Sequence, residues 1–273
     1  MIGLIKADFR KMSKSRSLII CMIIAAALGI GMALLYNYFW QEKGTSIAFT
    51  YNLMELYGID TAMLDDAFST IPKQNLWAFV NSFFSDEIKW ILSAICISSF
   101  MASEYSMGTF KNTVSRGFSK EKIYFSKMVV CAAEAFLVTA AYVGAGAVTS
   151  LFFVETETDA SLQEIALTMI TYILLLIAMA ALFEMLGVLF RSTGIAVAVA
   201  IAGPLLIVSI FNLLMSADPS VSAYLRYFLM QTFITVNDSV KDGEGFAALL
   251  TALAYFAVST VTGCVVFKKS EIK

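Results

Sequence analysis

Two carboxylates lie where a charge is costly, because Glu134 and Glu184 each stand within a long apolar segment of the sequence. An unpaired carboxylate in the hydrocarbon core of a membrane costs roughly 2.5 kcal/mol or more on insertion scales. Each side chain is therefore expected to face protein, water or a bound molecule. The residue types favour structural hydrogen bonding or an interfacial position, while contact with a substrate or a gating role stays open.

A catalytic or metal site is hard to assemble from the other residue types. Histidine is absent, which removes the most common zinc ligand and the usual general base at neutral pH. Buried free thiols are expected at the four cysteines, which lie far apart and form no CxxC pair: Cys21, Cys96, Cys131 and Cys264. The sequence also has no GxxxxGK(S/T) motif for nucleotide phosphates. An intramembrane protease or lipid transferase is therefore disfavoured, and no cofactor is predicted in this chain.

The elements that position these residues follow from composition. Of the residues, 59% are hydrophobic and 15% charged, and the mean hydropathy is +0.78, whereas soluble domains are roughly one quarter charged. A helix needs about 20 apolar residues to cross a hydrocarbon core of roughly 30 Å. The sequence therefore predicts an all-α polytopic membrane protein with one domain, residues 1–273. Six transmembrane helices are expected, at 18–39, 88–103, 124–154, 162–190, 194–215 and 246–267.

The first 16 residues have the pattern of a basic amphipathic helix, residues 1–16, that lies in the membrane interface. Apolar residues at helical spacing oppose basic ones in this segment: Ile2, Ile5, Phe9 and Met12 oppose Lys6, Arg10, Lys11 and Lys14. The alternative is a basic flank that only orients the first span.

The distribution of charge predicts the direction of the chain. Most of the 19 lysines and arginines fall in the N-terminal segment, in residues 104–127 and at the C-terminus. Because cytoplasmic loops are enriched in lysine and arginine, both termini are predicted to lie in the cytoplasm. The largest outer loop, residues 41–87, is too hydrophobic for disorder, and short helices on the outer membrane surface are expected there.

The cytoplasmic loop between the second and third spans carries the most informative pattern. It reads Glu104-Tyr105-x-x-Gly108-Thr109, then Ser115-Arg116-Gly117-x-Ser119-Lys120, followed by Tyr124 and Lys127. This pattern resembles the permease subunits of type-2 ATP-binding-cassette exporters, including bacterial peptide and antibiotic-resistance permeases. In topology the resemblance covers the whole chain, whereas the specific motif covers residues 104–127.

The resemblance implies that residues 104–123 form a cytoplasmic coupling loop that docks on a separate ATPase subunit. The residues that would contact or shape this coupling site are Glu104, Tyr105, Met107, Gly108, Thr109, Phe110 and Arg116. Apart from the family, a short helix that starts near Glu104 and ends at Gly117 would form a rigid lever, because an acid suits its positive end and glycine its C-terminus. A basic turn that only satisfies the positive-inside rule is the alternative.

The resemblance further implies a membrane-spanning permease subunit of an ATP-driven exporter in a bacterial-type plasma membrane. ATP and Mg²⁺ would bind to two partner ATPase subunits, and a second copy of this chain or a paralogue would complete the pathway. Nucleic acid is not an expected partner. The expected cargo is apolar or amphipathic, such as a peptide or peptide antibiotic, and moves outward by alternating access. A non-transporting membrane scaffold or sensor is the alternative function.

Three more features acquire roles within this interpretation. Residues 217–245 are expected to form an outer re-entrant element that closes the exit of the pathway. Pro204 interrupts the fifth span and is expected to kink the helix, with a hinge as the alternative. If Glu134 and Glu184 line the pathway, a cationic amphiphilic cargo would be favoured.

Overall fold

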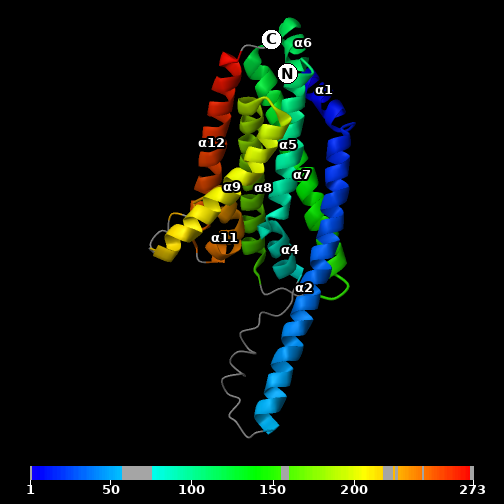
Figure 1. Cartoon of the computed structure of the whole chain (residues 1–273), viewed down its shortest axis with the longest axis vertical. Helices are drawn as coiled ribbons and strands as arrows, with labels where there is room; N and C mark the ends of the chain where they lie inside the picture. Colours follow the sequence, from blue (N-terminus) through cyan, green and yellow to red (C-terminus); the bar gives the residue numbers. More distant parts are fainter. Residues whose placement is uncertain are drawn as a thin grey trace.

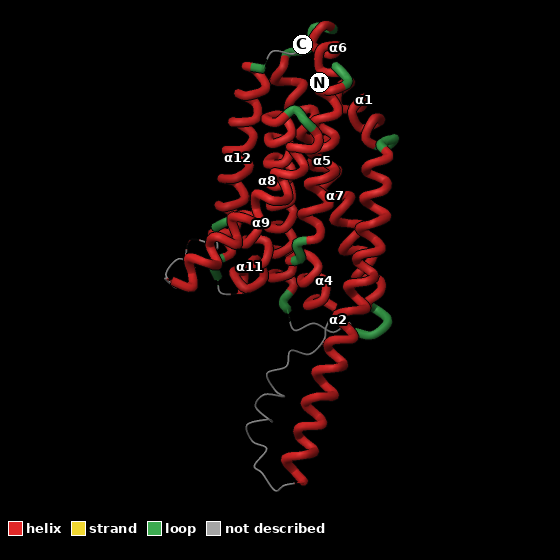
Figure 2. The backbone as a smooth tube through the Cα atoms, in the orientation of Figure 1, coloured by secondary structure: helices red, strands yellow, loops and turns green. Residues whose placement is uncertain are grey.

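The computed structural model describes residues 2–56, 76–154, 160–217, 224, 227–241 and 243–270. Within these ranges every regular element is a helix and there is no strand, which confirms the all-α prediction (Figure 2). The helices are α1 (Ile2–Met12), α2 (Arg16–Leu56), α4 (Leu76–Ser85), α5 (Ile88–Ser106), α6 (Thr109–Ser115), α7 (Lys120–Ser150), α8 (Leu162–Phe190), α9 (Thr193–Ala217), α11 (Leu229–Lys241) and α12 (Gly245–Lys269).

Several of the described helices are long and apolar enough to cross a membrane. These five spans are Arg16–Tyr38, Lys120–Ser150, Leu162–Phe190, Thr193–Phe211 and Gly245–Lys269. Apolar side chains point outward along them, since Ile23, Leu206 and Val258 are 64%, 62% and 65% exposed. Apolar surface on this scale requires lipid or another protein as its neighbour. Length, composition and exposure together indicate a membrane protein.

The sixth predicted span is present as a helix, α5, but it is not among the five apolar spans. Its sequence carries Lys89, Ser93 and Ser98, and all three side chains are buried within the protein. α5 contacts α2, α7, α8 and α9, so it lies inside the bundle rather than at its lipid-facing surface. A helix enclosed by other helices can carry polar residues that an outer helix cannot.

The helices form an elongated bundle in which both chain termini lie at the same end as α6 (Figure 1). We call this the α6 end. α4 and α11 lie toward the opposite end, which we call the α11 end (Figure 1). Two groups of buried apolar residues hold the bundle together. One surrounds Tyr172 and Phe183 of α8 and reaches α5, α7, α11 and α12, and the other fills the space between α2, α4, α5 and α7 around Phe83 and Tyr142.

One glycine allows α2 to approach α7 closely, and a second allows Phe83 of α4 to pack against α7. A Cβ atom on Gly29 would collide with the backbone carbonyl oxygen of Tyr142 on α7. A Cβ atom on Gly146 would lie 2.6 Å from Cζ of Phe83. Small residues at such crossings permit the close helix packing that association in a membrane requires.

The two predicted outer segments differ in part from expectation. Within residues 41–87, the structure shows no separate surface helix before residue 57, because α2 continues as one helix to Leu56 and runs past the α11 end (Figure 1). α4 packs against α7 and α11, and residues 57–75 lie outside the described part of the chain. The prediction of short outer helices is therefore wrong for residues 41–56.

The second predicted outer segment, residues 217–245, contains α11, which packs against α8, α12 and α4. Residues 218–223, 225, 226 and 242 of this segment lie outside the described part of the chain.

Candidate functional site

α1 lies against α7 through a stripe of three buried residues, Leu4, Asp8 and Met12, spaced four apart along the helix. The helix that the sequence predicts within residues 1–16 is present, and Ile2 of the predicted apolar face is 84% exposed, so the contact with α7 uses a different face. The apolar residues of α1 define two overlapping stripes, and contact with α7 selects the one that contains Leu4. The same stripe places an acid, Asp8, on the buried face.

Asp8 belongs to a buried network of charges at the α6 end. Nζ of Lys127 on α7 lies 2.7 Å from Oδ1 of Asp8 and 2.9 Å from Oε2 of Glu104 on α5. The hydroxyl of Ser126 donates a hydrogen bond of 2.8 Å to Oδ2 of Asp8. Asp8 and Lys127 are each 2% exposed and Glu104 is 6% exposed. One buried ammonium therefore bridges two buried carboxylates from different helices.

Lys11 supplies the second positive charge of the network. Its Nζ lies 3.3 Å from Oε1 of Glu104, and its side chain is 47% exposed. The network thus contains two acids and two bases and is neutral overall. Nζ of Lys127 also lies 5.0 Å and 5.9 Å from the ring centroids of Phe100 and Phe110, within the range of cation–π attraction. These contacts fix α1 on α5 and α7.

The turn between α5 and α6 depends on Gly108. Its φ of 64° is left-handed, a conformation that glycine adopts without steric cost. α5 therefore ends at Ser106, and α6 begins at Thr109. The predicted start of the short helix near Glu104 is wrong, because Glu104 still belongs to α5. The predicted end at Gly117 is confirmed, since α6 stops at Ser115 and Gly117 has a φ of 86°.

Phe110 anchors α6 in the bundle. Its side chain is 1% exposed, and its ring centroid lies 4.6 Å from that of Tyr105 and 5.0 Å from that of Phe267 on α12. The ring of Phe267 in turn lies 6.1 Å from that of Tyr124 on α7. The ring of Phe110 therefore connects α6 to α5 and α12, and Phe267 extends this aromatic cluster to α7.

The outer side of the same region is polar, basic and open. Met107, in the turn, is 73% exposed. The other exposed residues of α6 and its C-terminal turn are Lys111, Asn112, Ser115 and Arg116. The seven predicted site residues thus divide by exposure. Glu104 and Phe110 are buried; Tyr105, Gly108 and Thr109 are partly buried; Met107 and Arg116 are exposed.

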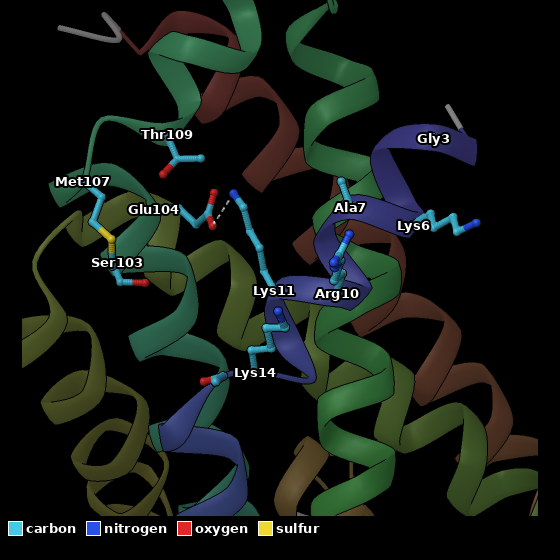
Figure 3. Close-up of a pocket in the computed structure, with 11 residues that line it drawn as sticks. Gly3, Lys6, Ala7, Arg10, Lys11, Lys14, Ser103, Glu104, Met107 and Thr109 are labelled. Carbon is cyan, nitrogen blue, oxygen red and sulfur yellow. Dashed lines mark hydrogen bonds and ion pairs between the residues drawn. The ribbon is translucent and has the colours of Figure 1, made fainter.

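An open cleft of about 820 Å³ separates α1 from the junction of α5 and α6 (Figure 3). Four of the lining side chains are cationic, and the only carboxylate is Glu104, which the network already engages. The lining residues are Gly3, Lys6, Ala7, Arg10, Lys11, Lys14, Ser15, Ser103, Glu104, Met107 and Thr109. The cleft is therefore suited to an anion.

A family model described as "Protein of unknown function (DUF2705)" matches residues 19–273. The chain belongs to the DUF2705 family. No curated protein matches the sequence. In this DUF2705 chain, α1 lies before the matched residues, whereas Glu104, Lys127 and α6 lie within them. The buried network therefore joins a segment outside the family match to two helices inside it.

The two membrane carboxylates of the DUF2705 chain lie away from the cleft. Glu134 on α7 is 1% exposed and Glu184 on α8 is 0% exposed. Within the described ranges, Oε2 of Glu134 and both carboxylate oxygens of Glu184 have no hydrogen-bond partner, so the expected protein hydrogen bond is not found at Glu184. Pro204 is buried in α9, and the helix continues through it. None of these three residues lines the cleft.

Sequence reasoning missed the roles of Asp8 and Lys11 and took Lys127 only as part of a motif. The available signal was weak: Asp8 is a single acid in a basic helix, four residues from Leu4 and from Met12. A metal site is not an alternative use of these acids, because Lys127 and Lys11 pair with them. In the described part of the chain, no group of three or more metal-ligating acids or cysteines is found.

Proposed function

We propose that this chain is the membrane-spanning permease subunit of an ATP-driven exporter, with α6 as the element that receives force from a separate ATPase. In this proposal the α6 end faces the cytoplasm and α5 is the sixth crossing. Two ATPase subunits bind ATP and Mg²⁺, and a second copy of this chain or a paralogue completes the pathway. The cargo is apolar or amphipathic, such as a peptide, and leaves by alternating access.

The proposed topology is supported by the position of the termini. Both termini lie at the α6 end, which requires an even number of crossings (Figure 1). α5 has 19 residues, about 28 Å of helix at 1.5 Å per residue, and runs from α4 to the turn before α6. Counting α5 with the five apolar spans gives the six crossings. The exposed Lys111 of α6 and the exposed Arg116 directly after this helix favour the cytoplasmic side for this end.

The observation that carries the proposal is the construction of α6. Its outer side offers exposed polar and basic side chains, while Phe110 on its inner side is buried against α5 and α12. A docking element needs both properties, because it must contact a partner and pass displacement to the membrane helices. A loop that only oriented the chain by its charge would not need a buried aromatic anchor.

Site-specific crosslinking tests this proposal. A photo-crosslinking amino acid is placed at Met107 or at Arg116, both exposed at the α6 end, and at Asp238, exposed on α11 at the other end. After irradiation in cells, the adducts are purified and identified by mass spectrometry. We expect an ATPase with nucleotide-binding motifs in the adducts of Met107 and Arg116 but not in those of Asp238.

Two results would overturn the proposal. If neither position at the α6 end captures an ATPase, α6 is not a coupling element. If all captured partners lack nucleotide-binding motifs, the scaffold or sensor function replaces the exporter. Substitution of Met107 by Asp provides a functional counterpart, since it changes only an exposed side chain and is expected to lower ATP-driven transport at least tenfold while leaving the amount of inserted protein unchanged.

A further inference from the structure

The cleft beside α1 carries an excess of positive charge. Lys11 and Lys127 neutralise Asp8 and Glu104, which leaves the other cations of the cleft unpaired. Among the described residues, the side chains of Lys6, Arg10 and Lys14 form no ion pair. Their mutual repulsion is unfavourable unless an anion lies between them.

The shape of α1 leaves space next to these charges. Gly3 and Ala7, one turn apart on the helix, line the cleft together with Arg10 and Lys14. A Cβ atom on Gly3 would meet no other atom within 4 Å, so the space beside it is open. Figure 3 shows Lys11 reaching from α1 across the cleft to Glu104, with Arg10 directly before it on α1 and Lys14 in the turn after α1. The network thus forms one wall and holds α1 in place.

The cleft opens beside a surface that faces lipid. Ser15 lines it and directly precedes α2, whose first turns expose Ile19, Ile20 and Ile23 by 48%, 54% and 64%. Because Arg16–Tyr38 is one of the apolar spans, this surface continues into the hydrocarbon region. The positive end of the α2 dipole also lies beside Ser15. A basic cleft at the end of an apolar helix face matches the two parts of one phospholipid molecule.

We propose that this cleft binds the headgroup of an anionic phospholipid. Its phosphate lies among Lys6, Arg10 and Lys14, and its acyl chains follow the outer face of α2. A free phosphate ion would use only the cations, and an acidic protein segment would not need the adjoining apolar face. The lipid uses both surfaces and joins α1 to the membrane at a fixed position. The inference requires a membrane-embedded chain but no ATPase, so its test is independent of the proposed function.

Lipid binding to the purified full-length chain in detergent tests the inference. The probes are acyl-labelled phosphatidylglycerol and phosphatidylcholine, with inorganic phosphate as a competitor. We expect phosphatidylglycerol to bind at least tenfold more tightly, given about fivefold per basic residue near anionic headgroups. The triple variant Lys6→Gln, Arg10→Gln, Lys14→Gln is expected to lose this preference. The matched control removes three exposed cations outside the cleft: Lys122→Gln, Lys241→Gln and Lys269→Gln.

The inference is supported if the control keeps the preference and millimolar inorganic phosphate does not displace the lipid. If both triple variants lose the preference for phosphatidylglycerol equally, the preference is a non-specific charge effect and the inference is overturned. Complete displacement by inorganic phosphate would assign the cleft to a free anion instead. A photo-crosslinker at Ala7 that captures a protein and no lipid would assign the cleft to a protein partner. Equal thermal unfolding of the two triple variants establishes that both are folded.

Discussion

The two ends of the bundle bury lysine in different ways. At the α6 end, Lys127 lies between two carboxylates from α1 and α5. At the α11 end, Lys89 is also 2% exposed, but its Nζ donates one hydrogen bond of 2.6 Å to the backbone carbonyl of Asp86 and lies 4.7 Å from the ring centroid of Phe233. Among the described residues, Lys89 forms no ion pair with a carboxylate.

The carboxylate at the α11 end is held by neutral donors. The hydroxyl of Tyr142 donates to Oδ2 of Asp86, and the backbone N–H of Ile88 donates to Oδ1. Nearby, the hydroxyl of Tyr172 donates to the amide oxygen of Asn81 at 2.8 Å. This end is therefore closed by hydrogen bonds from α7 and α8 to residues of α4 and of the turn between α4 and α5.

The difference shows which end depends on charge to join distant segments. Asp8 and Lys127 are 119 residues apart, so their pairing holds α1, the first helix, on α7, the sixth described helix. Neither can be removed alone without leaving a buried charge. This buried ion pair, which we call the charged joint, connects α1 to α7. The α11 end has no comparable joint among its described residues.

Removal of Lys127 is expected to give the largest effect. Lys127→Met leaves Asp8 and Glu104 buried with only Lys11 as a partly exposed counter-charge. Breaking a buried pair in this way costs about 3–5 kcal/mol. The thermal unfolding temperature of the purified protein in detergent, together with its resistance to limited proteolysis, measures the loss. We expect cleavage to begin in α1, because Asp8 is its buried polar contact with α7.

Lys122→Met is the matched control for this prediction. Lys122 lies on α7 within two turns of Lys127, and its side chain is exposed. Its effect is expected to stay within about 0.5 kcal/mol. If Lys127→Met unfolds at the same temperature as Lys122→Met, the network does not hold α1. The comparison of the two ends then loses its basis.

The hydrogen bonds of the α11 end are expected to give an intermediate effect. Tyr142→Phe removes a donor to the Asp86 carboxylate, and hydrogen bonds to charged groups contribute about 1.5–3 kcal/mol. Tyr172→Phe, the matched variant, removes a donor to a neutral amide, worth about 0.5–1.5 kcal/mol. Both rings are fully buried and remain in place. Unfolding of the two variants under the same conditions measures the difference, and equal losses would show that the charge of Asp86 does not matter.

The sequence predicts the helices well because apolar length and helical period are local properties. Five of the six expected spans are recovered, and the sixth is a helix. The position of α5 inside the bundle could not be predicted from the apolar segments of the sequence. Its contacts with α2, α7, α8 and α9 explain how this helix can carry the buried Lys89. The continuation of α2 to Leu56 was not predicted, because the polar residues after Trp40, with Lys43 followed by Gly44, favour a helix end before that point.

The candidate site was predictable only in part. Glu104, Lys127 and the glycines of the 104–127 segment stand out from their sequence pattern. The sequence pattern does not identify Asp8 as the partner of Lys127, because a pairing across 119 residues depends on how the helices pack. The exposure of each side chain is also a tertiary property, and it changes how the site is tested. Glu104 and Phe110 are poor positions for probing a partner because they are buried, whereas Met107 and Arg116 are accessible.

Removal of Lys89 is expected to give the smallest effect and tests the comparison most directly. Lys89→Met deletes one hydrogen bond to the Asp86 carbonyl and a contact with the Phe233 ring, and it replaces a buried ammonium by an apolar side chain of similar length. Burial of an ammonium group without a paired carboxylate costs free energy, which an apolar side chain at the same place does not incur. We therefore expect a change within about 1 kcal/mol of wild type, against a loss of about 3–5 kcal/mol for Lys127→Met. Both substitutions replace a buried lysine by methionine, so the change in side-chain volume is the same. A loss of unfolding free energy for Lys89→Met as large as that for Lys127→Met would mean that burial alone determines the cost. Pairing between distant helices would then not distinguish the α6 end from the α11 end.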